Sequence, residues 1–274
     1  MERTKLDISE AWASAVRMVA ANRDMLMAIA GVFFLLPGLA LSVFMGDPQV
    51  APGTDPKVAL SILAQTYLSA APLLILVTLL QMVGTLTVLI VMTDPARPTV
   101  AQAIRRATVT TPPYFGAQVL VGVVVGFSFV MIASLASLAG SAVLTTAVGL
   151  ALGAAMIWIG LRVSLVAPVI ATDGERNPLH AIRRSWDLMK GNSLRLALFL
   201  GLTLLLFLVV YGLVMMFVGV VLVLVTGGEI QRVLRDVVSS AISAVALVYL
   251  AAMIAAVHRQ LAGPPAGEAG RVFE

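Results

Sequence analysis

The side chains of this chain that could take part in chemistry are mostly basic, and they lie in short segments between long apolar runs. Arginine pairs occur twice in the same four-residue sequence, Ala-Ile-Arg-Arg, at 103–106 and 181–184. Basic side chains beside an anionic leaflet attract lipid head groups, each contributing about 1 kcal/mol. The same residues also suit a structural role, in which they anchor each segment at the membrane interface. The candidate surface for a lipid head group or a partner comprises Arg105, Arg106, Arg162, Arg183, Arg184, Trp186 and Lys190.

No catalytic or metal-binding set is recognisable among the other polar residues. The chain has no cysteine, and nothing in the sequence brings a third metal ligand to its two histidines, His180 and His258. The serines between 128 and 141 have no base at a recognisable spacing, and no Gly-x-Ser-x-Gly turn occurs. Acidic residues lie only in termini, connections and amphipathic segments, whereas membrane enzymes keep ionisable groups inside their spans. We therefore expect no enzymatic activity, no metal and no cofactor.

Composition identifies the solvent in which these residues must be positioned. Hydrophobic residues make up 60% of the chain and charged residues 12%, whereas about 25% of the residues of soluble domains are charged. This excludes a water-soluble fold. A helix that crosses a bilayer needs about 20 mostly apolar residues, which predicts an all-α integral membrane protein with six transmembrane helices. The predicted spans are Met25–Phe44, Tyr67–Met92, Tyr114–Ala139, Ala142–Ala171, Leu196–Thr226 and Val237–Val257.

Two boundaries are set by length. The uncharged run 107–161 is too long for one crossing, and the small residues at 139–141 are expected to turn it into a hairpin. The run 58–92 is also too long, so we predict a partly interfacial segment over 58–71 and a helix that starts near Pro72, which suits a first turn.

The distribution of lysine and arginine predicts the orientation. Only Lys57, Arg232 and Arg235 fall on one side, which leaves 15 of the 18 basic residues on the other. Basic loops stay in the cytoplasm, so both termini are expected there. The net charge of +4 is then a topology signal and requires no nucleic-acid partner. Richness in alanine and valine and short connections favour a bacterial cytoplasmic membrane.

Self-similarity predicts three tandem units, each with an amphipathic interfacial helix followed by a two-helix hairpin. The units are roughly 7–92, 99–172 and 178–258 of a single domain, 1–262, and residues 263–274 are expected to be a disordered tail. Setting Ala11 beside Ala181 also sets Asn22 beside Asn192. Because each unit starts on the same side, the three should be related by an axis along the membrane normal and form one bundle.

Apolar spacing of three and four residues defines the interfacial helices. We expect Asp7 or Ser9 to cap the first helix, and the second, Thr99 to Thr111, to end at Pro112 and Pro113. The predicted apolar stripes are Ile8, Ala11, Trp12, Ala15 and Val19 in the first unit and Leu179, Ile182, Trp186 and Met189 in the third.

Two G-x-x-x-G pairs predict close packing of the third and fourth spans, because glycine lets helices approach closely. The pairs are Gly122 with Gly126 and Gly149 with Gly153.

A few polar residues within or near the spans leave alternatives open. Arg162 either reaches the cytoplasmic interface or pairs with Asp94, Asp187 or a lipid phosphate. Interhelical hydrogen bonds or a polar path would explain Gln81, Thr85, Thr87 and Tyr211.

The run from Arg162 through Pro168 and Asp173 into the helix 181–192 resembles the membrane domain of some glycerophosphoryl diester phosphodiesterases and of many stand-alone bacterial membrane proteins. The resemblance implies a six-helix membrane module. It does not imply phosphodiesterase activity, because that reaction belongs to a separate soluble barrel.

The leading hypothesis is a non-enzymatic polytopic membrane protein that acts in envelope or lipid homeostasis, or as a membrane partner subunit. Its expected partners are membrane lipids, anionic ones included, or another membrane protein. The alternative is a transporter or lipid translocator with a path between the repeats. An intramembrane hydrolase ranks last, because it needs a nucleophile and a base within hydrogen-bond reach.

Overall fold

The computed structural model describes residues 5–45, 50–51, 53–138, 140–225 and 227–263, and these residues form helices and connections without a strand. The expected tail, apart from Gly263, lies outside the described residues. The elements are α1 (Ile8–Ala21), α2 (Arg23–Ala30), η1 (Gly31–Leu35), α3 (Leu36–Met45), α4 (Pro56–Ser69), α5 (Ala71–Thr93), α6 (Val100–Leu138), α7 (Ala142–Val163), α8 (Val166–Thr172), α9 (Pro178–Leu188), α10 (Ser193–Val225) and α11 (Gly228–Ala262).

Six of the described segments are long and apolar enough to cross a membrane, which confirms the predicted fold class. The first combines α2, η1 and α3, and the fourth combines α7 and α8. Both predicted boundaries are present. Pro72 lies in the first turn of α5 after the separate helix α4, and Gly140 has a φ of +66°. Glycine adopts this left-handed conformation without a steric cost, so the chain turns there, and Ser141 caps α7.

The predicted end of the second interfacial helix at Pro112 and Pro113 is wrong, because α6 continues through both prolines. In the turn before them, the hydroxyl of Thr111 donates to the carbonyl of Ala107 at 2.8 Å, and that of Thr110 donates to the carbonyl of Arg106 at 3.1 Å. Proline is tolerated inside membrane helices when threonine side chains and neighbouring helices compensate the backbone. The interfacial segment and the third span therefore form one helix.

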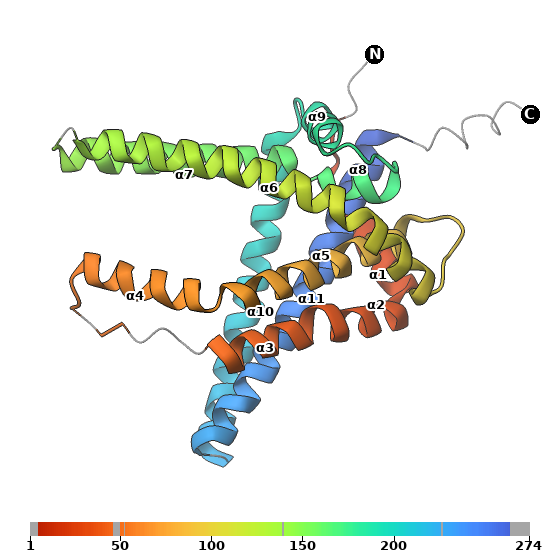
Figure 1. Cartoon of the computed structure of the whole chain (residues 1–274). Coiled ribbons are helices and arrows are strands. Elements are labelled where there is room, and N and C mark those ends of the chain that lie inside the picture. Colours follow the sequence, from red (N-terminus) through yellow and green to blue (C-terminus); the bar gives the residue numbers. More distant parts are fainter. Residues whose placement is uncertain (1–4, 46–49, 52, 139, 226, 264–274) are drawn as a thin grey trace, which may run out of the picture.

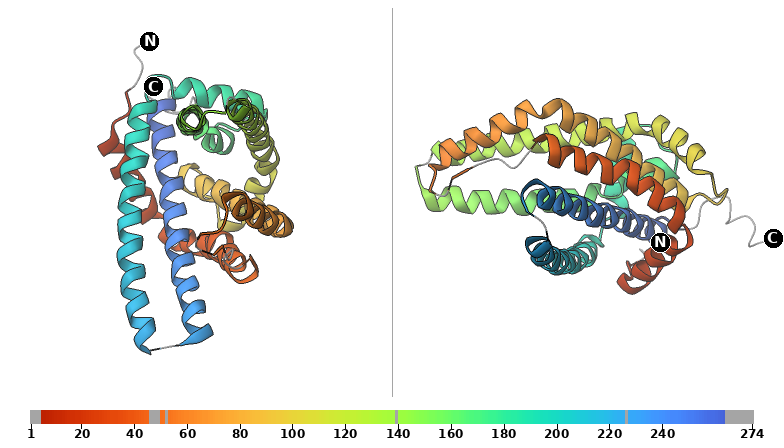
Figure 2. Two further views of the ribbon diagram at one scale, coloured as in Figure 1. Left: turned by 90° about the vertical axis from the view of Figure 1, so that its left-hand side faces the viewer. Right: turned by 90° about the horizontal axis from the view of Figure 1, so that it is seen from below.

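The long helices do not share one direction. In Figure 1 the α6–α7 hairpin and the pair α3 and α5 extend toward the same side, whereas α10 and α11 run across them. The left view of Figure 2 shows the same relation, because α10 and α11 are seen lengthwise whereas the α6–α7 hairpin, α3 and α5 are seen nearly end-on. This departs from the single bundle expected around one axis. The main neighbours of α10 are α11, α7 and α1, so its packing does not align it with α5 or α6.

A buried core lies where three helix segments converge, and we call this region the hub. It consists of the second half of α5, all of α8 and the last half of α11, which contact one another. Many of its fully buried side chains are Leu, Ile or Val from α5 and α8, whereas α11 contributes mainly alanines. The alanines are Ala244, Ala251, Ala252, Ala255 and Ala256. Small residues allow membrane helices to approach closely, and these alanines face the neighbouring helices of the hub.

Each segment of the hub is covered by an amphipathic helix. The start of α6 packs on α5, α9 packs on α8, and α1 packs on α11. The last contact joins the two ends of the chain: Gln260 accepts a hydrogen bond from the Asp7 amide at 3.2 Å and donates to the Asp7 carbonyl at 3.3 Å. The Asp7 carboxylate also accepts from the Glu10 amide, which identifies Asp7, not Ser9, as the cap of α1.

The buried faces of α1 and α9 match the predicted stripes only in part. In α1 the buried residues are Ala11, Ala15 and Met18, and Trp12 remains 36% exposed. At α9 they are Ala181, Ser185 and Met189, and Leu179 is 52% exposed. Ala11, Ala15 and Met189 were predicted correctly, whereas the exposed Trp12 and Leu179 were not. The alanines and Ser185 let the helices approach closely.

Glycine packing is also found at a different position. A Cβ atom placed on Gly122, Gly126, Gly149 or Gly153 would meet no atom within 4 Å beyond its own helix, so the predicted close approach at these glycines is not present. Gly84 of α5 is the residue in close contact, because a Cβ there would lie 2.5 Å from the Cβ of Phe33 in η1. A methyl group at position 84 would therefore displace η1.

Candidate functional site

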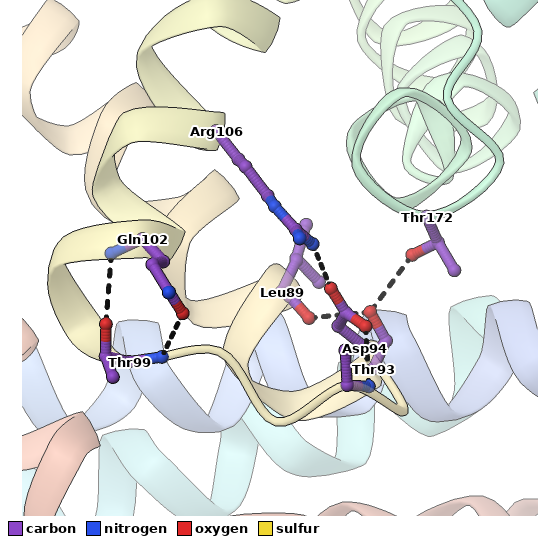
Figure 3. A network of polar contacts seen from close by, with 8 residues as sticks. Leu89, Thr93, Asp94, Thr99, Gln102, Arg106 and Thr172 are labelled. Carbon is purple, nitrogen blue, oxygen red and sulfur yellow. Dashed lines mark hydrogen bonds and ion pairs between the residues drawn. The ribbon is translucent and has the colours of Figure 1, made fainter.

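The first polar junction of the hub lies where α5 ends (Figure 3). Asp94 follows the last residue of α5, and its carboxylate forms an ion pair with Arg106 of α6 and accepts from the Ala96 amide at 2.8 Å. The hydroxyls of Thr93 and Thr172 lie 3.2 Å apart and connect α5 with α8. The acid therefore fixes the start of α6 relative to the end of α5.

A capping box orients the same part of α6. The Thr99 amide donates to the side-chain oxygen of Gln102 at 3.1 Å, and the Gln102 amide faces the Thr99 hydroxyl at 3.4 Å (Figure 3). Such a reciprocal pair satisfies two backbone donors that have no partner inside the helix. It fixes where α6 begins, and thereby where Arg105 and Arg106 project.

The second junction lies where α8 ends, and it contains one more side chain, a histidine. One oxygen of Asp173 lies 2.6 Å from Nε of Arg184 in α9, and the other lies 3.5 Å from Nε2 of His258 in α11. His258 is 2% exposed, and the Asp173 side chain is 22% exposed. Burial raises the pKa of Asp173, but His258 and Arg184 lower it by more, so the pKa of this carboxyl lies below its usual value.

The two junctions share a sequence pattern that sequence reasoning missed. Each reads Thr-Asp-x-x-Arg, at 93–97 and 172–176, and is followed by the Ala-Ile-Arg-Arg helix. In both, the acid pairs with the second arginine of that helix. The first arginines, Arg105 and Arg183, are exposed and form no ion pair with any residue that the structure describes. The repeated Thr-Asp pair in the sequence could have indicated these two ion pairs.

Arg162 of α7 lies against two tryptophans. Its guanidinium carbon is 4.7 Å from the ring centre of Trp158 and 5.1 Å from that of Trp186, and the two rings meet edge to face. The Ser185 hydroxyl donates to the Arg162 carbonyl at 2.7 Å. Asp94, one of its proposed partners, is instead paired with Arg106. Cation–π contacts thus hold Arg162 and join α7 to α9.

The remaining predicted residue, Lys190, pairs with Asp187 at 2.6 Å just after α9. An open hollow of about 450 Å³ lies on this helix, and its charged lining is mixed: Glu175, His180, Arg183, Arg184 and Asp187. The described residues contain no group of three His, Cys, Asp or Glu side chains that could hold a metal ion. Of the predicted basic surface, Arg105 and Arg183 are therefore the exposed cations without an acidic partner among the described residues.

No protein-family model, curated protein or solved structure that we compared with this chain matches it.

Proposed function

We propose that this chain is a non-enzymatic multi-pass protein of a bacterial cytoplasmic membrane that binds anionic lipid head groups, and that it acts in envelope or lipid homeostasis. The observation that carries the proposal is the exposure of Arg105 and Arg183 beside arginines that are already ion-paired. A phosphate group would supply the missing negative charge, because arginine donates to phosphate in a two-pronged geometry. Both termini lie on the cytoplasmic side in this proposal, which agrees with the basic residues there.

The proposal also includes three related units, similar to the membrane domain that residues 162–192 resemble. Two observations support it. The junctions at 93–106 and 172–184 have the same acid–arginine pairing, and α1 covers α11 as α6 covers α5 and α9 covers α8. Arg105 and Arg183 are then equivalent positions of neighbouring units.

The test is the thermal stability of the purified protein in a neutral detergent with added phosphatidylglycerol or phosphatidylcholine. A ligand that binds the folded state raises the melting temperature. We expect a larger rise with phosphatidylglycerol, and a loss of most of this difference in Arg105→Ala plus Arg183→Ala. The matched control, Lys57→Ala plus Arg232→Ala, removes two exposed charges from the opposite predicted side and should retain it.

An equal response to both lipids, unaffected by either double variant, would contradict lipid binding at this surface. It would favour the other role expected from the sequence, a membrane partner subunit, and the proteins that co-purify with the chain would be the next measurement.

A lipid translocator is the second candidate, and one cavity favours it. Gln81 and Thr85 of α5 line a hollow of about 130 Å³ with Thr78 and Tyr114. Thr87 and Tyr211 do not line this hollow. Thr87 donates to the Val83 carbonyl, and Tyr211 shares a hydrogen bond with Ser239. In proteoliposomes, translocation predicts movement of a fluorescent phospholipid between leaflets that Gln81→Leu abolishes; movement no faster than in protein-free liposomes would contradict it.

A further inference from the structure

A second basic hollow lies apart from α9, between α1, the connection from α5 to α6, and the end of α11. Its volume is about 620 Å³. Three arginines from these three segments line it: Arg17, Arg97 and Arg259. The exposed Arg105 and Arg183 are not among its lining residues. The fold therefore brings together three cations that are far apart in the sequence.

The positive charges of the three arginines in this hollow are not neutralised by acidic residues that the structure describes. Its one acidic lining residue, Asp94, already forms an ion pair with Arg106 and accepts from the Ala96 amide. None of the three arginines forms an ion pair within the described part of the chain. Like charges gathered in one place repel one another, and a bound anion would remove that repulsion.

The backbone adds an independent observation at Arg97. Its φ is +45°, and no other non-glycine residue that the structure describes has a positive φ. Such a conformation costs a non-glycine residue about 1–2 kcal/mol, and it concentrates at ligand-binding sites. Arg97 belongs to the short connection from α5 to α6, between Pro95 and the buried Pro98. Both prolines also line the hollow. Arg97 is thus held in place by a rigid, strained connection.

The chemistry of the lining identifies the class of ligand. Three arginines from three different segments can donate to the several oxygens of a phosphate group, to which arginine binds more specifically than lysine. The hollow is also lined by the buried apolar side chains of Met18, Val91 and Met92. A phosphate on an apolar stem would satisfy both parts of the surface.

We infer that this hollow is a phosphate-binding site in which Arg17, Arg97 and Arg259 bind the phosphate oxygens. The inference deepens the proposed function, because a lipid head group is one source of the phosphate and free phosphate is the other. It does not depend on Arg105 or Arg183, so the two ideas fail separately.

The experiment is calorimetric titration of the purified full chain in neutral detergent with short-chain phosphatidic acid and, separately, inorganic phosphate. We expect Arg17→Gln plus Arg259→Gln to weaken phosphatidic acid binding about tenfold or more, as expected for lost charge-assisted hydrogen bonds. The control, Arg23→Gln plus Arg176→Gln, removes two exposed arginines outside the hollow, one of them at the position in the second junction that matches Arg97.

Arg97→Gly keeps the test decisive if the double variant folds poorly. Glycine adopts the φ of position 97 without strain, so this variant should melt at the same or a higher temperature and yet bind phosphatidic acid more weakly. If Arg97 had only a structural role, phosphatidic acid binding and the melting temperature would change together in this variant.

The two ligands distinguish the source. If phosphatidic acid alone binds, or binds far more tightly than inorganic phosphate, the site takes a lipid; comparable binding of both assigns it to phosphate from solution. The inference is overturned if neither ligand binds, or if the hollow and control variants weaken binding equally.

Discussion

The hub and the outer parts of the hairpins are equally apolar in sequence, but they differ in what covers them. In the α6–α7 hairpin, Ala136 is the only buried residue among those described between 118 and 160. In the α10–α11 hairpin, Leu222 is the only buried residue among those described between 204 and 243. We call these two stretches the arms. By contrast, half of the most apolar stretch of α11 is buried within the protein.

The difference teaches that hydropathy does not tell which apolar residue faces protein and which faces lipid. Lipid tails are as apolar as leucine, so burial of large side chains between helices gains little in a membrane, and close packing decides. Buried alanines accordingly recur on α11 in the hub and on α1, which covers it, whereas the arms expose leucine, valine and phenylalanine.

The strongest test of this comparison removes the same side chain from each region. Leu89→Ala in the hub should lower the free energy of unfolding by about 2–5 kcal/mol, because Leu89 is 1% exposed and the substitution leaves a cavity. Leu224→Ala in the arm, where the residue is 80% exposed, should change it little. Denaturant unfolding in detergent measures both, and equal losses would remove the distinction between hub and arms.

The second test concerns charges. Asp173→Asn should cost about 1.5–3 kcal/mol, because the partly exposed carboxylate loses its interactions with Arg184 and His258. Its counterpart in an arm, Asp236→Asn, loses an ion pair at 3.9 Å and should cost less. If the arm variant proves the more destabilising in the same assay, the hub is not where polar contacts stabilise the fold.

A third test uses glycine. Gly84→Ala should destabilise the hub by about 1–3 kcal/mol, since its Cβ would lie 2.5 Å from that of Phe33 and force the helices apart. Gly126→Ala in the arm meets open space, so its melting temperature should match or exceed that of the parent. An unchanged melting temperature for Gly84→Ala would show that η1 yields without cost.

The smallest expected effect is a pH dependence. Because the pKa of Asp173 is lowered on folding, its contribution to stability is fully present above the unfolded pKa of about 4 and is lost as the pH falls through the lowered value. The stability difference between the parent and Asp173→Asn should therefore shrink on acidification below about pH 4. A stability difference that grows below this pH would show that folding raises the pKa of Asp173 instead of lowering it.

The sequence predicted the elements of this fold better than their arrangement. Long apolar runs and the Gly140 turn located the six helices, because these signals act within one segment. The direction of α10 and α11, the continuity of α6 and the contact at Gly84 depend on neighbours from elsewhere in the chain. No local pattern encodes them, and the G-x-x-x-G pairs in the arms indicated the wrong place.

The candidate site was predictable in composition and not in geometry. Spacing identified Arg105, Arg106, Arg183 and Arg184 as one surface, but only the structure separates the exposed member of each pair from the ion-paired one. His258 appeared as the end of a span, although it is buried against Asp173. The convergence of Arg17, Arg97 and Arg259 requires three distant segments, so no spacing could have revealed it.

The contact of α1 with α11 has a consequence for the order of synthesis. Because α1 precedes α11 in the chain, it leaves the ribosome well before this partner, so its buried face, with Ala11, Ala15 and Met18, remains uncovered by α11 until α11 has been inserted. Assembly of the hub is thus delayed until α11 has been translated. An intermediate stalled before α11 would present that face to chaperones and to membrane proteases.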